Sequence, residues 1–174
     1  MKADRVQRKF ESTLATWRAR LGPRPEADFG RRPAGGGWCL GQVCDHLKSA
    51  SDLLLGEAEK CARGEGERKG AQVMPAMITL FGSLPPGRFK VPDKPELRKL
   101  AEPRELTKDA ALECLGAMGK RVTELRDPGA AAPRNLRRRH PAAGWMNAVQ
   151  FYQVAEMHLR HHLRQLARIE RALQ

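Results

Sequence analysis

Apolar side chains recur every three or four residues over four long stretches of the sequence, and this spacing constrains the fold more than any other feature. The first stretch, residues 4–21, shows the pattern most clearly, with steps of 4, 4, 3 and 4. Its apolar residues are Val6, Phe10, Leu14, Trp17 and Leu21. Such steps place the side chains along one face of an α-helix. No run alternates between apolar and polar residues with the period of two expected of a half-buried strand, so the sequence predicts an all-α fold.

The other three stretches have recognisable ends. We expect the second helix over residues 38–62, and the third from an N-cap at Thr107 to a stop at the Asp-Pro-Gly of residues 127–129. The fourth should run from about Gly144 to the C-terminus. Four amphipathic helices can bury their apolar faces against one another, which predicts an antiparallel four-helix bundle. For a chain of 174 residues we expect one domain, spanning residues 1–174.

The segments between these helices differ in character. Residues 73–84 are apolar and predict a short extra helix, whereas the proline-rich residues 85–95 cannot be helical. We therefore expect residues 84–104 to run outside the bundle as a long crossover. Residues 128–143 should form a loop without strands. This loop holds an arginine cluster, Arg134, Arg137, Arg138 and Arg139.

Composition limits the function classes. The chain has 32 basic and 20 acidic side chains, a formal net charge of +12, which suits nucleic acid, an anionic small molecule or a solvated surface. Nucleic acid is disfavoured, because no aromatic side chains stand among the arginines to stack on bases. No apolar run approaches the ~20 residues that span a bilayer. The N-terminal residues also lack the apolar segment of a secretory signal. We expect a cytoplasmic protein without a membrane partner. Its cysteines, in no metal-binding spacing, should be reduced thiols.

Three of the five histidines lie on the last predicted helix, and helical geometry separates them. At 100° per residue, His162 and His158 lie about 30° and 70° from the centre of the apolar face, but His161 lies about 130° away. His46 on the second helix lies on the flank of that helix's buried face. An i, i+4 pair can chelate one metal ion, and a third imidazole would complete a site with open coordination positions. Hydrogen-bonded core histidines are the other interpretation.

The side of the last helix that carries His161 is rich in arginine. We expect an exposed basic face there. Its members are Arg160, Arg164, Arg168 and Arg171.

Two segments resemble the signatures of a known family. Residues 38–47, Trp-Cys-Leu-Gly-Gln-Val-Cys-Asp-His-Leu, resemble the W-x(3)-Q-x(3)-H-L segment of the DinB-like superfamily of metal-binding four-helix bundles. Residues 158–166, His-Leu-Arg-His-His-Leu-Arg-Gln-Leu, are similar to its last-helix signature, H-x(2)-H-H-x(2)-Q-L. The turn at residues 140–144 and the proline-rich crossover also match one branch of the family. Cys39 and Leu40 depart from the usual Ser/Pro-type helix start.

The resemblance implies a ligand set and a chemistry. The ligands would be His46, His158 and His162, with His161 a neighbour that does not bind. The ion would be divalent nickel, zinc, iron or manganese. Some family members are thiol-dependent transferases or isomerases that use low-molecular-weight thiols. Dimers are common among them, so the resemblance implies a homodimer.

We therefore expect a divalent-metal-binding protein that acts as a thiol-dependent transferase, in which the three-histidine site activates a thiol or water. Its small-molecule substrate would be anionic if the arginine cluster lies at the mouth of the site; a solvated basic loop is the alternative. Gln42, four residues before His46, points the same way and is either a residue that supports the ligands, a pocket residue or a surface amide. Trp38 and Trp145 should anchor the core. The competing hypothesis is a non-enzymatic basic helical bundle that binds nucleic acid or a protein partner.

Overall fold

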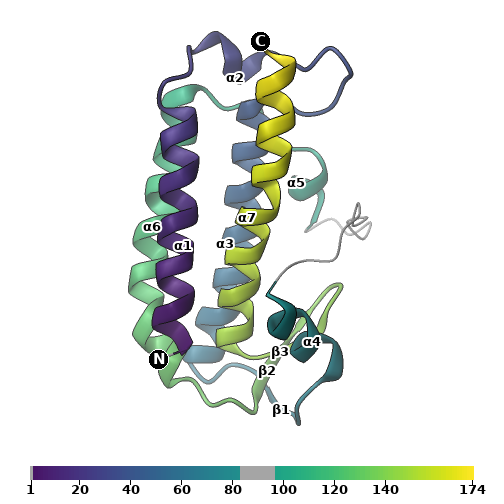
Figure 1. Ribbon diagram of the computed structural model, residues 1–174. Coiled ribbons are helices and arrows are strands. Elements are labelled where there is room, and N and C mark those ends of the chain that lie inside the picture. Colours follow the sequence, from purple (N-terminus) through teal and green to yellow (C-terminus); the bar gives the residue numbers. More distant parts are fainter. Residues whose placement is uncertain (1, 83–96) are drawn as a thin grey trace.

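The computed structural model describes residues 2–82 and 97–174. It is predominantly helical, and the all-α prediction is confirmed. Four long helices lie side by side along one axis (Figure 1). They are α1 (Lys2–Leu21), α3 (Leu40–Ala62), α6 (Lys108–Ala131) and α7 (Ala148–Ala172). The shorter elements are α2 (Ala27–Gly30), α4 (Val73–Phe81), α5 (Arg98–Ala101), β1 (Glu67–Arg68), β2 (Leu136–His140) and β3 (Gly144–Met146).

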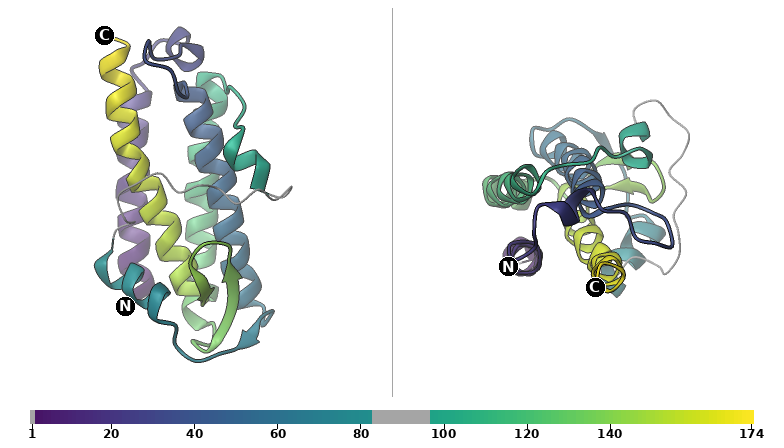
Figure 2. Two further views of the ribbon diagram at one scale, coloured as in Figure 1. Left: turned by 90° about the vertical axis from the view of Figure 1, so that its right-hand side faces the viewer. Right: turned by 90° about the horizontal axis from the view of Figure 1, so that it is seen from above.

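The four long helices surround a common core, as the view from above shows (Figure 2, right). α1 and α7 run in one direction, and α3 and α6 run in the other. The contacting pairs α1–α6 and α3–α7 are therefore antiparallel, whereas α3–α6 and α1–α7 are parallel. A parallel pair that is consecutive among the long helices needs a connection running the length of the bundle. The sequence analysis predicted a long crossover at this place, over residues 84–104.

The polar ends of the buried aromatic side chains are satisfied inside the core. Phe10 stacks on Tyr152, with 6.2 Å between ring centroids. The Tyr152 hydroxyl donates to the Val122 carbonyl (2.9 Å), and Trp17 Nε1 donates to the Leu159 carbonyl (3.1 Å). Because these bonds remove the cost of burying a hydroxyl and an indole N–H, the rings tie α1, α6 and α7 together.

Two helix starts are set by side-chain caps. The predicted cap at Thr107 is confirmed, since its Oγ1 accepts from the Ala110 amide (3.3 Å). The last helix begins at Ala148 and not at about Gly144, because Asn147 and Gln150 form a capping box that the sequence analysis overlooked. Asn147 Oδ1 accepts from the Gln150 amide, and Gln150 Oε1 accepts from the Asn147 amide.

The predicted stop of the third long helix at residues 127–129 is wrong. α6 continues through Pro128 to Ala131. Proline removes one helical hydrogen bond and strains the preceding turn. The helix continues because its buried stripe does, from Leu125 through Gly129 to Ala132. Packing of this stripe outweighs the local preference of proline.

The expectation of a strand-free loop before the last helix is also wrong. β2 and β3 form an antiparallel hairpin in which Arg139 faces Trp145, and β1 adds to the other edge of β2. The small sheet lies at one end of the molecule and leaves the helical core intact (Figure 1). Its strands are too short for an alternating pattern to appear in the sequence.

The predicted short helix is present as α4, which ends at Gly82, a left-handed residue with φ 63°. Most of the predicted crossover, residues 83–96, lies outside the described residues. Its described end contains α5, which rests against α3. Within residues 2–82 and 97–174, no helix is long and apolar enough to cross a membrane.

Candidate metal centre

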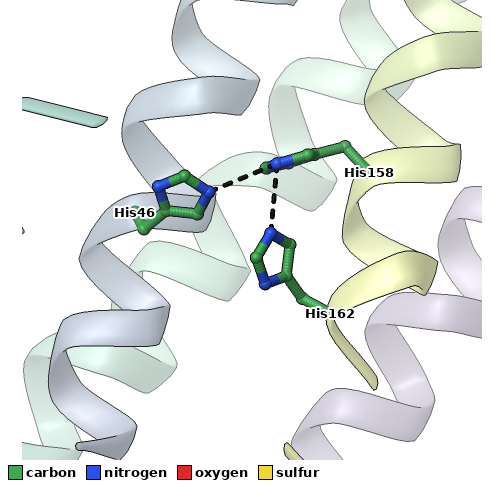
Figure 3. Close-up of side chains that lie close together, drawn as sticks. All are labelled: His46, His158 and His162. Carbon is green, nitrogen blue, oxygen red and sulfur yellow. Dashed lines mark hydrogen bonds between the residues drawn. The ribbon is translucent and has the colours of Figure 1, made fainter. Parts of the chain in front are cut away.

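Three imidazoles from two helices meet at one point between α3 and α7 (Figure 3). His46 comes from α3, and His158 and His162 come from consecutive turns of α7. His158 Nε2 lies 3.2 Å from His46 Nε2 and 3.2 Å from His162 Nε2. Their ligand atoms all lie within 4.8 Å of one another. The structure thus brings together the three histidines singled out in the sequence.

The outer nitrogens of two of these rings are held by hydrogen bonds. His46 Nδ1 donates to the Leu100 carbonyl of α5 (2.8 Å), and His162 Nδ1 donates to Gln165 Oε1 (2.7 Å). A neutral imidazole that donates from Nδ1 has an unprotonated Nε2. Both rings therefore direct a lone pair at the centre, as metal-binding histidines do.

The third ring is different. His158 Nδ1 is fully buried and has no hydrogen-bond partner within the described part of the chain. In a metal-binding tautomer this nitrogen carries the proton, and nothing among the described residues accepts it. Hydrogen bonds at Nδ1 therefore orient two of the three rings of the centre, and His158 lacks such a bond among the described residues.

Burial makes all three rings neutral near pH 7. It is the largest cause that lowers the pKa of His162, to about 4, and the nearby His46 lowers it further. Burial, followed by His162 and His46, lowers the pKa of His158 well below its ordinary value. The pKa of His46 is also lowered by burial, against an opposing effect of its bond to Leu100. Neutral imidazole is the form that binds a metal.

A short segment after α5 is anchored on α3 beside His46. Gln42 Nε2 donates to the Pro103 carbonyl (3.2 Å), and Asp45 Oδ2 accepts from the Arg104 amide (2.9 Å). Asp45 is buried although it is a carboxylate. Gln42 is not a surface amide: it is buried, its Oε1 caps the start of α3 at Cys39, and its contact with Pro103 agrees with a supporting position behind His46. These anchors position the carbonyl that accepts from His46.

Trp38 forms part of the site as well as of the core. It packs against the core cluster, and its ring lies 4.8 Å from the His46 ring, centroid to centroid. The core contact expected from the sequence is therefore one of two contacts that Trp38 makes. Its spacing from His46 did not predict the second, because Trp38 lies before α3, where helical periodicity does not apply. Trp145 does not anchor the core as expected. It lies in β3, and the Lys69 ammonium lies over its ring, 4.4 Å from the ring centroid.

The arginine cluster does not lie at the mouth of the site. Its members lie in or beside β2, at the end of the molecule that holds the sheet (Figure 1). Arg137 is buried and donates to the Lys69 and Trp145 carbonyls and to Gln150 Oε1. Arg138 pairs with Glu57, which lies three turns beyond His46 on α3. These arginines hold the sheet to the bundle.

His161 lies outside the three-histidine group, as the helical geometry predicted. Its ring meets that of His162 edge-on at 5.5 Å. Arg164, Arg168 and Arg171 on the same side of α7 are exposed, and Arg160 is partly exposed. The basic face predicted from the sequence is therefore present.

The fold and the site together define a class: a helical protein with a buried three-histidine cluster suited to a metal ion. Comparison with protein families agrees, because the model of the DinB superfamily matches residues 9–166. The chain belongs to the DinB superfamily. No curated protein and no solved structure shows a significant match.

Proposed function

We propose that His46, His158 and His162 hold one divalent metal ion and that the protein is a metal-dependent transferase acting with a low-molecular-weight thiol. The observation that carries the proposal is the convergence of three Nε2 atoms whose rings are neutral, two of them oriented by bonds from Nδ1. Two tetrahedral ligands at the usual zinc–nitrogen length are about 3.3 Å apart. Two of the three separations, from His158 Nε2 to His46 Nε2 and to His162 Nε2, are 3.2 Å and match this value, and all three ligand atoms lie within 4.8 Å of one another.

The donor set narrows the choice of ion. Imidazole suits zinc, nickel and iron, whereas manganese favours carboxylate and water oxygen. No carboxylate belongs to the cluster found among the described residues, and the adjacent Asp45 is bound to Arg104. Zinc, nickel and iron therefore fit the site better than manganese does.

Three protein ligands leave at least one coordination position open, which is the arrangement of catalytic sites. A bound divalent ion supplies Lewis acidity and lowers the pKa of a thiol or water at that position. The chain itself orients the rings through the Leu100 carbonyl and Gln165, and Trp38 covers one side of His46.

The thiol in this proposal comes from a co-substrate. Burial raises the pKa of Cys44 to about 12, and burial also raises the pKa of Cys61 and Cys114. Cys39 is fully buried. Such thiols are poor nucleophiles near pH 7, so the protein does not present a reactive thiolate of its own.

Positive charge near the centre favours an anionic co-substrate. Arg168 is close enough to His162 to contribute to lowering its pKa, after burial, His46 and His161. Arg164 and Arg168 likewise lower the pKa of His161, after burial. These residues, and not the arginine cluster of β2, would attract a carboxylate-bearing thiol.

Metal content tests the first part of the proposal. Protein prepared without a histidine tag, loaded with zinc and dialysed, should retain about one equivalent per chain by elemental analysis. His162→Ala should retain less than about a tenth of an equivalent, because two ligands hold an ion far less well than three. His161→Ala is the matched control and should retain the full equivalent. Wild-type protein below a tenth of an equivalent would favour the non-enzymatic basic bundle.

Thiol consumption tests the second part. Metal-loaded protein mixed with a carboxylate-bearing thiol and an aryl halide electrophile should consume free thiol faster than the His162→Ala variant does. Full metal occupancy without any such difference would leave a metal-binding protein and remove the transferase assignment.

A further inference from the structure

One face of α4 exposes an apolar stripe to the outside of the molecule. Its members are between 46% and 81% exposed: Val73, Met74, Met77, Leu80 and Phe81. At 100° per residue they fall within an arc of about 120°. The opposite face holds α4 in place, since Pro75 is buried, Ile78 packs against the core, and Gln153 Nε2 donates to the Thr79 carbonyl (2.7 Å). These five are the exposed large hydrophobic residues found in the described part of the chain, so the patch is a local feature of this helix.

A basic hollow lies between α1 and α7 beside this helix. It is shallow and open to solvent, has a volume of about 460 Å³ and is lined by Arg5, Arg8, Lys9, Ser12, Thr13, Glu156 and Arg160. Glu156 is buried and accepts from Arg160 and Thr13, so its charge is neutralised within the wall. Arg5, Arg8 and Lys9 form no ion pair among the described residues. The hollow therefore carries uncompensated positive charge and two hydroxyl groups.

The stripe and the hollow are parts of one surface. Arg160 Nη2 donates to the carbonyl of Gly82, the residue that ends α4 (2.6 Å). In Figure 1, α1, α7 and α4 all lie on the side facing the reader, with α4 next to the lower half of α7. Leu80 and Phe81 at the end of α4 thus stand near the arginine that lines the hollow.

We propose that this face binds the surface of an anionic phospholipid membrane, with the stripe of α4 in the interface and the basic hollow on headgroup phosphates. A helix that carries large apolar side chains next to Lys and Arg is suited to lie in the plane of such an interface. Cations beside the membrane attract anionic lipid. The expectation of no membrane partner rested on the absence of a spanning segment from the sequence. It did not include an apolar helix face that stays exposed after folding.

Two other binding partners match the charges and side chains of this face less well than a membrane does. A second copy of the chain would bring two proteins of net charge +12 together at a face that already holds unpaired cations. An acidic protein partner would satisfy the charges, but protein interfaces depend on anchoring side chains in well-packed pockets, and the hollow beside the stripe is lined by charged and hydroxyl side chains. A fluid lipid surface needs no such pocket.

Vesicle co-sedimentation tests the proposal. Full-length protein should sediment with phosphatidylglycerol–phosphatidylcholine vesicles and not with pure phosphatidylcholine, and about 0.5 M salt should weaken binding. Leu80→Ser with Phe81→Ser should lower the partition coefficient at least about tenfold, because two apolar side chains leave the interface. Arg5→Glu with Arg8→Glu should lower it by a similar factor. Arg31→Glu with Arg171→Glu makes the same charge change at the opposite end of the bundle, where α2 and the end of α7 lie, and should have a much smaller effect.

Three outcomes would overturn the proposal. One is absence of sedimentation with anionic vesicles at low salt. Another is equal loss in both arginine pairs with no effect of the α4 variant, which would indicate non-specific adsorption. The third is a dimer, measured by light scattering, that Leu80→Ser with Phe81→Ser dissociates, which would assign the stripe to a second copy. Unchanged thermal melting and zinc retention in each variant would show that the fold is intact.

Discussion

At the scale of the residue, burial is what prepares the histidines of the centre for a metal ion. His162, His158 and His46 all have pKa values below the ordinary 6.5, with burial as the first cause. The same burial destabilises the folded state when the pH falls, because a buried ring resists protonation while the same ring in the unfolded chain accepts a proton. The site is therefore ready to bind a metal at neutral pH and sensitive to acid.

The metal-free protein should lose stability as the pH falls below about 6.5. His162 is neutral in the folded state down to a pKa of about 4, so its contribution is complete above 6.5 and is lost between 6.5 and 4. A shift of this size corresponds to about 3 kcal/mol in the free energy of unfolding. Urea unfolding at pH 7.5, 6 and 5 would measure it, with His162→Gln expected to show a shallower decline. A free energy that stays constant over this range in the wild type would contradict the prediction.

At the scale of the element, helix ends depend on packing as much as on local preference. Thr107 caps α6 as the sequence predicts, and Asn147 caps α7 by the same kind of side-chain bond. Pro128 does not end α6, because the apolar stripe continues beyond it. The helix thus retains an unfavourable residue within its last turns.

Pro128→Ala should stabilise the protein. Alanine restores an amide that can donate to the helix and removes the clash of the proline ring with the preceding turn, an effect of about 1–3 kcal/mol. Pro128 is exposed, so no core contact is lost. Thermal unfolding would show a raised Tm, whereas Pro133→Ala, outside the helix, serves as the control and should not. A lowered Tm for Pro128→Ala would mean that α6 depends on proline at this position.

At the scale of the whole molecule, the connection between α3 and α6 supports the metal centre. The segment that follows α5 is bound to α3 through Gln42 and Asp45, and α5 supplies the carbonyl that accepts from His46. Gly41 permits this close approach. A Cβ atom there would come within 2.6 Å of the Leu106 amide nitrogen and would meet its carbonyl oxygen as well.

Gly41→Ala should therefore disturb the fold and the centre together. Backbone crowding of this kind costs about 1–3 kcal/mol, and displacing the segment would weaken the bond from His46 to Leu100. We expect a lower Tm and weaker zinc binding by calorimetric titration. Gly56→Ala on the same helix is the control, since its Cβ would meet only Arg121 at an ordinary 3.6 Å. If the Gly41→Ala variant is destabilised but binds zinc with unchanged affinity, the connection between α3 and α6 does not support the metal centre.

The sequence by itself determined the four long helices and which histidines share a side. Both follow from periodicity within one segment: the stripe from Val6 to Leu21 is buried throughout, and His158 and His162 share a face because they are four residues apart on one helix. The second helix offered His46 by the same geometry and by its likeness to the family segment. These features need no knowledge of which elements meet.

Only the tertiary structure decided the features that depend on distant partners. β2 forms because β1 and β3 pair with it. Its arginines bind Glu57 and the backbone carbonyl of Lys69 at the end of the bundle, away from the metal centre. Packing between elements also brings Trp38 against His46 and leaves the apolar stripe of α4 exposed. Periodicity states which face of an element is apolar, but long-range contacts determine whether another element covers that face.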